Sequence, residues 1–445
     1  MRDAGPRDPF DHVRFWQTQR SEKGWWHSFE LPDGSRIEGV CGLESLRNRI
    51  AQYPIPADLR GKRVLDIGTW DGFFAFEMEK RGADVMAVDN WDNPRFREMH
   101  ARLGSRVDYR QFDIYDLTPA RIGRFDIVLF MGVLYHLKHP LLALERVCAL
   151  TTEMAAVDSF ILREEHLHNA RLAKRPILEF FETNQFGGQT DNWNAPTLAC
   201  LLALCRTAGF ARAEFRNTLE HCACVACYRK WAPPREGIDS AAELVEVWHD
   251  RNFGINFDSA HDEYVSAAIL AGGRNLTLDE VKPEVSGFGV RPIHVALTRD
   301  QRWEAKFKLP PGLAPGWHGV AVRIGDGPPG NEKPIAVDIP LQPGPIRITG
   351  VCDGTTWAAD QLNLARGNSV AIWVAGLPEN ADRNNVRVYL DGRRLRVDFV
   401  ETRRGTESRQ VNAEVPLEAE RGLARLGVAL GDSRSEAAKL TLLAG

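Results

Sequence analysis

The chain lacks any run of about 18 consecutive apolar residues, so the sequence predicts no membrane-spanning helix. It is also poor in cysteine, with 8 in 445 residues, which is too sparse for a small disulfide-stabilised scaffold. An excess of positive charge is missing as well, because 56 Lys and Arg residues stand against 60 Asp and Glu. This balance excludes a protein that is basic throughout and binds nucleic acid non-specifically.

The sequence also predicts that a secretory signal is absent. Residues 1–20 are charged and contain no apolar stretch, so no signal peptide is expected and the protein is predicted to be cytoplasmic. A metal knuckle is not expected either, although Cys222, Cys224 and Cys227 lie close together. Cys222 and Cys224 alternate with small apolar residues as on one face of a strand, and a second cysteine pair at zinc spacing is missing.

The composition changes along the chain and predicts a multidomain protein. Apolar strand-like runs alternate with helix-like stretches up to about residue 230, which is typical of a parallel sheet covered by helices. Short β-runs separated by turn residues follow from about residue 285 and favour all-β sandwiches. The predicted segments are an aromatic-rich N-terminal segment or lid (1–59), an α/β domain (60–232), a helical connector (233–284) and one or two β-sandwich modules, which as two would span 285–342 and 343–445.

Residues 64–74 read as a strand, a tight turn and the start of a helix. Gly68 and Gly72 allow the backbone to approach a ligand closely, and Asp89 ends the next strand. A carboxylate in that place accepts hydrogen bonds from ribose hydroxyls. Asp71, near the helix N-terminus, would repel a pyrophosphate, whereas S-adenosylmethionine (SAM) carries a sulfonium and an ammonium. The charge therefore favours SAM over a dinucleotide as the cofactor.

Three further strand ends carry residues of the same kind. Asp113 and Ile114 follow the third predicted strand, Met131 and Gly132 follow the fourth, and Asp158 ends the fifth. Ligands of open α/β sheets bind in the crevice outside the carboxyl ends of the strands. The sequence therefore predicts one site at this edge of the sheet.

Residues 61–73 and 131–140 resemble a class I SAM-dependent methyltransferase, with a Rossmann-like fold. More narrowly, they resemble the subfamily of tRNA wobble-uridine methyltransferases that form 5-methoxy and 5-carboxymethoxy groups. Residues 26–34 and 193–196 resemble further segments of these relatives, so the similarity covers roughly residues 14–230. The β-rich C-terminal region is similar to immunoglobulin-like sandwiches of the bacterial kind, which act as spacers or binding modules.

The resemblance implies a set of cofactor contacts. The methionine end of SAM would be held by Asp66, Gly68, Thr69, Trp70, Asp71 and Gly72, the ribose by Asp89 and Asn90, the adenine by Asp113 and Ile114, and the sulfonium by Met131 and Gly132. Tyr135 would lie over the transferring methyl group. A late arginine that holds the extra carboxylate in carboxymethyl-transferring relatives has no counterpart near Cys222, which favours ordinary methyl transfer.

Methyl transfer to oxygen needs alignment of donor and acceptor and a base for the acceptor hydroxyl. The candidate catalytic residues are His136, Tyr135 and Asp158, with His136 the preferred base because imidazole titrates near neutrality. The candidate acceptor-binding residues are Trp26, His27, Glu182 and Trp193. For Trp26 and His27 the alternative is an anchor that packs the N-terminal segment onto the sheet.

The sequence leaves two classes of methyl acceptor open. It also leaves one alternative to an enzymatic function. The first class is a hydroxyl of a small molecule or saccharide, and the second is a hydroxylated wobble uridine in tRNA. A basic face for tRNA would be formed by Arg95, Arg97, Arg102, Arg106 and Arg110, for which a solvated surface is the alternative. The alternative to an enzyme is a non-catalytic SAM-binding scaffold. The β-modules are expected to bind a partner or to mediate oligomerisation.

Overall fold

A computed structural model describes residues 24–238, 242–402 and 407–443. The chain divides into two compact units. The first contains residues 1–238 together with 282–291 and 310–313, and the second contains the rest. None of the helices in the described ranges combines the length and apolar character that crossing a bilayer requires.

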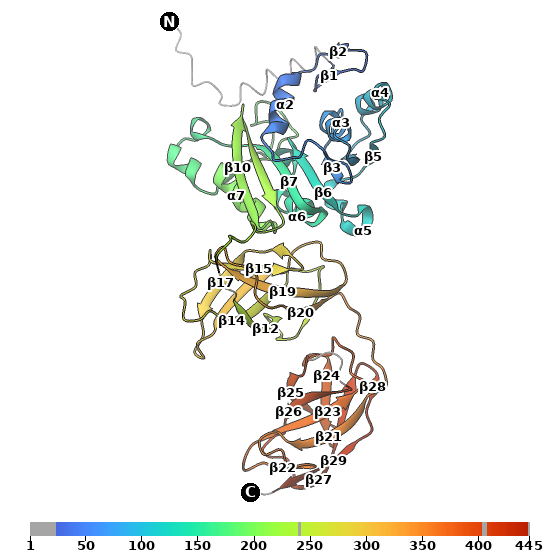
Figure 1. The fold of residues 1–445 in the computed structure, drawn as a ribbon, viewed down its shortest axis with the longest axis vertical. Helices are drawn as coiled ribbons and strands as arrows, with labels where there is room; N and C mark the ends of the chain where they lie inside the picture. Colours follow the sequence, from blue (N-terminus) through green and yellow to red (C-terminus); the bar gives the residue numbers. More distant parts are fainter. Residues whose placement is uncertain (1–23, 239–241, 403–406, 444–445) are drawn as a thin grey trace. The chain divides into compact units, whose positions relative to one another are not determined.

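The first unit is built on a seven-stranded sheet with the order β10-β11-β7-β6-β3-β4-β5 (Figure 1). Five neighbouring strands are parallel, and β10 and β11 pair antiparallel at one edge. The predicted α/β domain is therefore confirmed, as is the strand containing the cysteines. The strands are β3 (Arg63–Ile67), β4 (Asp84–Asp89), β5 (Asp108–Gln111), β6 (Phe125–Met131), β7 (Thr151–Phe160), β10 (Arg212–Leu219) and β11 (Cys222–Tyr228).

Helices cover both faces of this sheet because its strands are apolar on both sides. Val64 points into one core and its neighbour Leu65 into the other, and both side chains are fully buried. The helices are α2 (Leu43–Ala51), α3 (Phe73–Lys80), α4 (Pro94–Leu103), α5 (Pro119–Ile122), α6 (Pro140–Leu150) and α7 (Leu198–Thr207). The 3-10 helices are η1 (Ile114–Asp116), η2 (Leu134–His136), η3 (Glu164–His166) and η4 (Ala170–Lys174), and two small sheets pair β1 (Phe29–Glu30) with β2 (Arg36–Ile37) and β8 (Leu178–Phe180) with β9 (Asn194–Pro196).

Two short pieces from later in the chain complete the first unit. Strands β15 (Val281–Val285) and β16 (Phe288–Gly289) form an antiparallel pair, and residues 310–313 lie against Arg229. The Arg229 side chain is buried and donates to the Pro311 carbonyl and the Cys148 sulfur, each at 2.9 Å. Its guanidinium also lies 4.2 Å from the centre of the Phe288 ring. A single buried cation thus ties both pieces to the α/β domain.

The described residues of the second unit are all-β (Figure 1). The predicted helical connector was wrong for residues 242–281, which form β12 (Glu243–His249), β13 (Asn256–Phe257) and β14 (Tyr264–Leu270). Asp258 serves a turn in this segment, because its carboxylate accepts from the Ala260 amide at 2.8 Å. The apolar run of β14 is compatible with a buried strand or a buried helix. Its pairing with β18 makes it a strand.

Two groups of strands make up the rest of this unit. The four-stranded sheet β12-β14-β18-β17 adds β17 (Pro292–Leu297) and β18 (Trp303–Lys308), and β13 pairs with β20 (Lys333–Val337), which pairs with β19 (Gly316–Ile324). The nine-stranded sheet contains β21 (Arg347–Asp353), β22 (Gln361–Asn363), β23 (Ser369–Ala375), β24 (Val386–Leu390), β25 (Arg393–Val400), β26 (Ser408–Glu414), β27 (Gly422–Leu430), β28 (Ser433–Arg434) and β29 (Ala438–Leu443). Its inward residues, among them Ile372 and Val388, form a separate core.

Candidate active site

The predicted site residues meet at the carboxyl ends of the parallel strands. Met131 on β6 pairs in register with Asp158 on β7, and Asp66 on β3 pairs with Leu129 on β6 and Ala87 on β4. The strand order places β3, which carries the turn, at the centre of the parallel strands. This brings together side chains that are up to about 90 positions apart in the sequence.

Asp66 lies near the end of β3, just before the turn. Its side chain is almost fully buried and accepts a hydrogen bond from Thr69 Oγ1 at 2.7 Å. Burial raises the pKa of Asp66 from 3.8 to about 6, against the lowering effect of the Thr69 hydrogen bond. The fold therefore holds a buried carboxyl group whose ionised form a nearby cation would stabilise.

The turn itself requires three residues with positive φ. Gly68, Trp70 and Gly72 have φ of 71°, 56° and 96°. A Cβ on Gly68 would overlap the side chain of Val133, so glycine is required there by space as well as by conformation. Trp70 adopts the left-handed region without being glycine, and its amide is held by Asp89.

Asp89 closes the other side of the turn. One carboxylate oxygen accepts from the Trp70 amide at 2.9 Å and the other from the Asn90 amide at 2.8 Å. The Trp91 amide also acts on this carboxylate and lowers its pKa. Acceptor capacity remains, because a carboxylate accepts about four hydrogen bonds. Burial raises the pKa of Asp89, as it does for Asp66. The next tryptophan, Trp91, lies 5.6 Å from Trp70 between ring centres.

Asp71 and His27 bind each other. The fully buried Asp71 carboxylate accepts from the Trp26 and His27 amides, each at 3.0 Å, and forms a very short contact with His27 Nδ1. Their predicted roles in binding cofactor and acceptor remain untested, but this geometry favours the anchor interpretation of the N-terminal segment. Residues 1–23 of the predicted lid lie outside the described part of the chain.

Asp113 and Ile114 lie at the end of β5 as predicted. Asp113 is exposed, and its carboxylate accepts from the Tyr115 amide at 2.9 Å and so caps η1. Ile114 is buried in the core beneath it. The Asn90 carbonyl accepts from Gln111 Nε2 at 3.0 Å, which joins the ends of β4 and β5.

The three predicted catalytic residues have very different surroundings. His136 is partly exposed, and its Nδ1 donates to the Asp191 carbonyl at 2.9 Å, which leaves Nε2 as the acceptor of the neutral ring. Burial holds the pKa of Tyr135 well above its usual range, so this hydroxyl stays protonated. Asp158 is fully buried and pairs with Arg49 at 3.5 Å. Only His136 therefore has the surroundings of a general base.

Arg49 is a site residue that the sequence analysis missed. It comes from α2, and the negative charge of the Asp158 carboxylate holds the pKa of Arg49 above its usual range. The other oxygen of Asp158 is buried without a hydrogen-bond partner in the described residues. One signal was present in the sequence: Arg49 lies three positions after Leu46 and so shares the buried face of the helix with it and Ile50.

The last predicted acceptor residues lie on the insertion after β7. The Trp193 amide donates to the Tyr135 carbonyl at 2.7 Å, and Lys138 Nζ lies 4.2 Å from the centre of the Trp193 ring. Glu182 is exposed. A small cavity of about 110 Å³ lies nearer the turn, where Trp26, Trp70 and Trp91 line it. Aromatic walls of this kind suit a flat organic ligand.

Comparisons with known proteins agree with this geometry. Residues 38–175 match the family model described as "Methyltransferase domain". The chain contains a class I SAM-dependent methyltransferase domain. This domain is 35% identical over 85 residues to a ubiquinone biosynthesis O-methyltransferase from Acinetobacter baylyi, a match that covers 18% of this chain and 36% of that protein.

A second relative matches a longer stretch of the chain. The ubiquinone biosynthesis O-methyltransferase of Azotobacter vinelandii is 37% identical over 135 residues, which is 29% of this chain and 54% of that protein. The chain thus spans about a third to a half of the length of these curated relatives. Among solved structures, the N-terminal domain of EvdMO1, crystallised with SAH and D-fucose, aligns with a TM-score of 0.34 at 19% identity and covers 49% of this chain and 96% of that one.

The residues of the methyltransferase domain fit SAM. Two buried carboxylates with raised pKa, Asp66 and Asp89, suit a ligand that carries a sulfonium and an ammonium, because a cation offsets the loss of solvation. Asp89 also keeps acceptor capacity for ribose hydroxyls. A Cβ on Gly132 would meet only the Tyr135 hydroxyl, at 3.5 Å, so the backbone beside Met131 is open to a ligand.

Proposed function

We propose that the protein transfers a methyl group from SAM to a hydroxyl of a small molecule or saccharide. The observation that carries this proposal is the turn at residues 68–72 held between Asp66 and Asp89 at the crevice of the sheet. The matched relatives are O-methyltransferases, which supports oxygen as the acceptor atom. Methyl transfer is preferred over carboxymethyl transfer because no arginine lies beside Cys222 in sequence to hold a second carboxylate.

Each group in the proposed mechanism has a separate task. Bound SAM supplies an electrophilic methyl carbon with a good leaving group. Asp89 holds the ribose, Asp66 holds the cationic methionine end, and Met131 lies at the strand end beside them. His136 Nε2 accepts the proton of the acceptor hydroxyl, and the Asp191 carbonyl keeps the proton of the neutral ring on Nδ1.

A tRNA acceptor is less favoured because four of the five arginines of the predicted basic face are paired with carboxylates. Arg95 and Arg102 both pair with Glu98, at 2.9 and 2.6 Å. Arg97 pairs with Asp92 at 2.6 Å, and Arg110 with Asp108 at 2.7 Å. Guanidinium groups already paired with carboxylates release few counterions from a phosphate backbone.

Transfer of label from methyl-labelled SAM tests the proposal. The wild-type protein is incubated with total tRNA and, separately, with a nuclease-treated extract fractionated by size. Label in small or saccharide fractions, lost in His136→Gln while SAM affinity is kept, is the expected result. Nuclease-sensitive label in tRNA would replace the proposed acceptor class. SAM binding by calorimetry with no transfer into any pool would instead favour the scaffold alternative.

The all-β unit is proposed to bind a partner or to support assembly, and its similarity to immunoglobulin-like sandwiches remains part of this proposal. Its own core and its own sheets fit a module with a separate task. A methyltransferase acting on small molecules needs no such unit for the chemical step. The unit is therefore the natural place to look for a second binding activity.

A further inference from the structure

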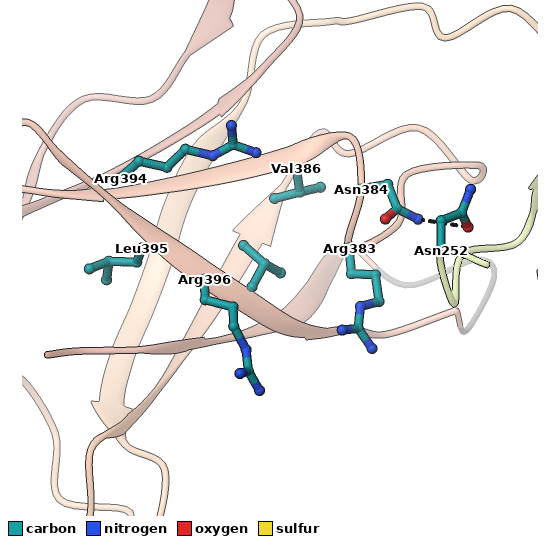
Figure 2. Close-up of a pocket in the computed structure, with 8 residues that line it drawn as sticks. Asn252, Arg383, Asn384, Val386, Arg394, Leu395 and Arg396 are labelled. Carbon is teal, nitrogen blue, oxygen red and sulfur yellow. Dashed lines mark hydrogen bonds between the residues drawn. The ribbon is translucent and has the colours of Figure 1, made fainter.

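A cavity of about 350 Å³ lies in the all-β unit, far along the chain from the methyltransferase residues. Three of the residues that line it are arginines: Arg394 and Arg396 on β25, and Arg383 in the loop before β24 (Figure 2). No acidic residue lines the cavity. Its volume is within the ~300–1,000 Å³ of typical small-ligand sites.

Two of the three arginines have no carboxylate partner among the described residues. The Arg394 guanidinium forms no ion pair and no hydrogen bond in that part of the chain, and the Arg383 guanidinium lies over the face of Phe253, at 5.3 Å from the ring centre. Arg396 differs, because Asp398 accepts from its Nε at 2.7 Å and Glu414 lies 3.5 Å away. Two guanidinium groups are therefore available to a ligand while the third is fixed in place.

A network of side-chain hydrogen bonds holds the loop that carries Arg383. The buried Asp382 carboxylate accepts from the Ile255 amide at 3.0 Å, from Asn256 Nδ2 at 2.6 Å and from the Asn384 amide at 2.9 Å. Asn384 Nδ2 in turn donates to Asn252 Oδ1 at 3.2 Å, a contact drawn in Figure 2. The loop on both sides of Arg383 is thus held before any ligand arrives, which lowers the entropy lost on binding.

We propose that this cavity is a binding site for a sugar-sized ligand that bears a carboxylate or phosphate. A guanidinium fork matches the geometry of both oxyanions and binds either through two parallel hydrogen bonds. The side-chain amides of Asn252 and Asn384 border the same space and offer both donors and acceptors to hydroxyl groups. Val386, Leu395 and Val397 complete the lining, although their side chains are almost fully buried in the core of the unit. This binding activity does not depend on methyl transfer.

Calorimetry of the full-length protein with glucose, glucose 6-phosphate, glucuronate and inorganic phosphate tests the inference. Glucose 6-phosphate or glucuronate is expected to bind at low salt, and glucose at least ten-fold more weakly. The tighter of the two anions identifies the oxyanion. Inorganic phosphate binding as tightly as the phosphosugar would overturn the sugar part of the proposal.

The variant Arg383→Gln/Arg394→Gln is expected to lose binding by about ten-fold for each arginine, because a charged hydrogen bond is replaced by a neutral one. Arg383→Lys/Arg394→Lys should keep part of the affinity, which a merely structural role would not predict. Arg366→Gln, at an exposed position of the same unit, is the matched control and should bind as wild type does. Thermal melts check that each variant is folded. No binding of any anionic probe to the wild type, or unchanged binding by the double glutamine variant, would overturn the proposal.

Discussion

Asp66→Asn is expected to stabilise the methyltransferase domain while it weakens SAM binding. The pKa of Asp66 rises from 3.8 to about 6 on folding, so the ionised side chain disfavours the folded state at neutral pH. A difference of about two pKa units at about 1.4 kcal/mol each amounts to about 3 kcal/mol at pH 7. Asparagine keeps the shape of the side chain and an oxygen that accepts from Thr69 Oγ1. The variant should recover most of this free energy of unfolding.

The direction of the Asp66 pKa shift determines how the stability difference between Asp66→Asn and the wild type depends on pH. A carboxyl group whose folded pKa is raised destabilises the folded state above about pH 6, and the effect fades as pH falls toward the unfolded value of 3.8. The difference between variant and wild type should therefore be largest at pH 7.5 and about half as large at pH 5. SAM affinity of the wild type should rise with pH through about 6, since the ionised form binds the cation.

Differential scanning calorimetry of the full chain measures the effect. The relevant transition is the one that added SAH shifts, because the two units need not unfold together. A gain of about 2–3 kcal/mol should raise its midpoint by roughly 5–10 °C. A variant that melts below the wild type at pH 7.5, or a difference that is the same at both pH values, would refute the argument from burial.

Four further outcomes follow from named contacts. Asp89→Asn should weaken SAM binding by at least about ten-fold in calorimetry, since it removes a charged acceptor; unchanged affinity would contradict the ribose assignment. Arg49→Met should lower the free energy of unfolding by about 3–5 kcal/mol, because it strands a buried carboxylate, and adding Asp158→Asn should restore part of the loss; simple additivity in denaturant titrations would argue against the pair. His136→Gln should reduce kcat by about 10²-fold or more without changing SAM affinity, and an equal loss of both would assign it to cofactor binding instead. Arg229→Met should lower the midpoint of the first unit and increase protease cleavage near residues 310–313, because carbonyls that it satisfies become unpaired; wild-type cleavage would show that the contact is dispensable.

The grouping of the residues proposed to bind the cofactor could be predicted from the sequence because they lie at strand ends. Gly68, Gly72 and Asp89 lie within one strand-turn-helix-strand unit, and parallel strands always bring such ends to one edge. The acceptor side could not be predicted to the same degree. Asp71 lies in the turn, yet its partner His27 is more than forty positions away in the sequence. No local sequence pattern predicts that contact.

In the second unit, too, local turns could be predicted from the sequence and long-range contacts could not. Its turns were predictable, because Asp391 and Gly392 carry the chemistry of a two-residue hairpin and both have positive φ in the structure. The segment at 264–270 was not, because a short apolar run suits a buried helix or a buried strand equally and only its pairing with β18 decides between them. The sequence also could not predict that Arg394 has no carboxylate partner among the described residues, because ion pairing depends on which acidic residues the fold brings near.

The sequence by itself determined the methyltransferase domain, the order of its strands and helices, and the carboxylates at its strand ends, because each depends on periodicity and on residues close together in the chain. Only the tertiary structure decided which charges are paired. It placed Arg49 against Asp158 and His27 against Asp71, and it left Arg383 and Arg394 without carboxylate partners among the described residues. The physical reason is that burial and the distance between charges set the energy of an ionised group, and both exist only once distant segments have packed together.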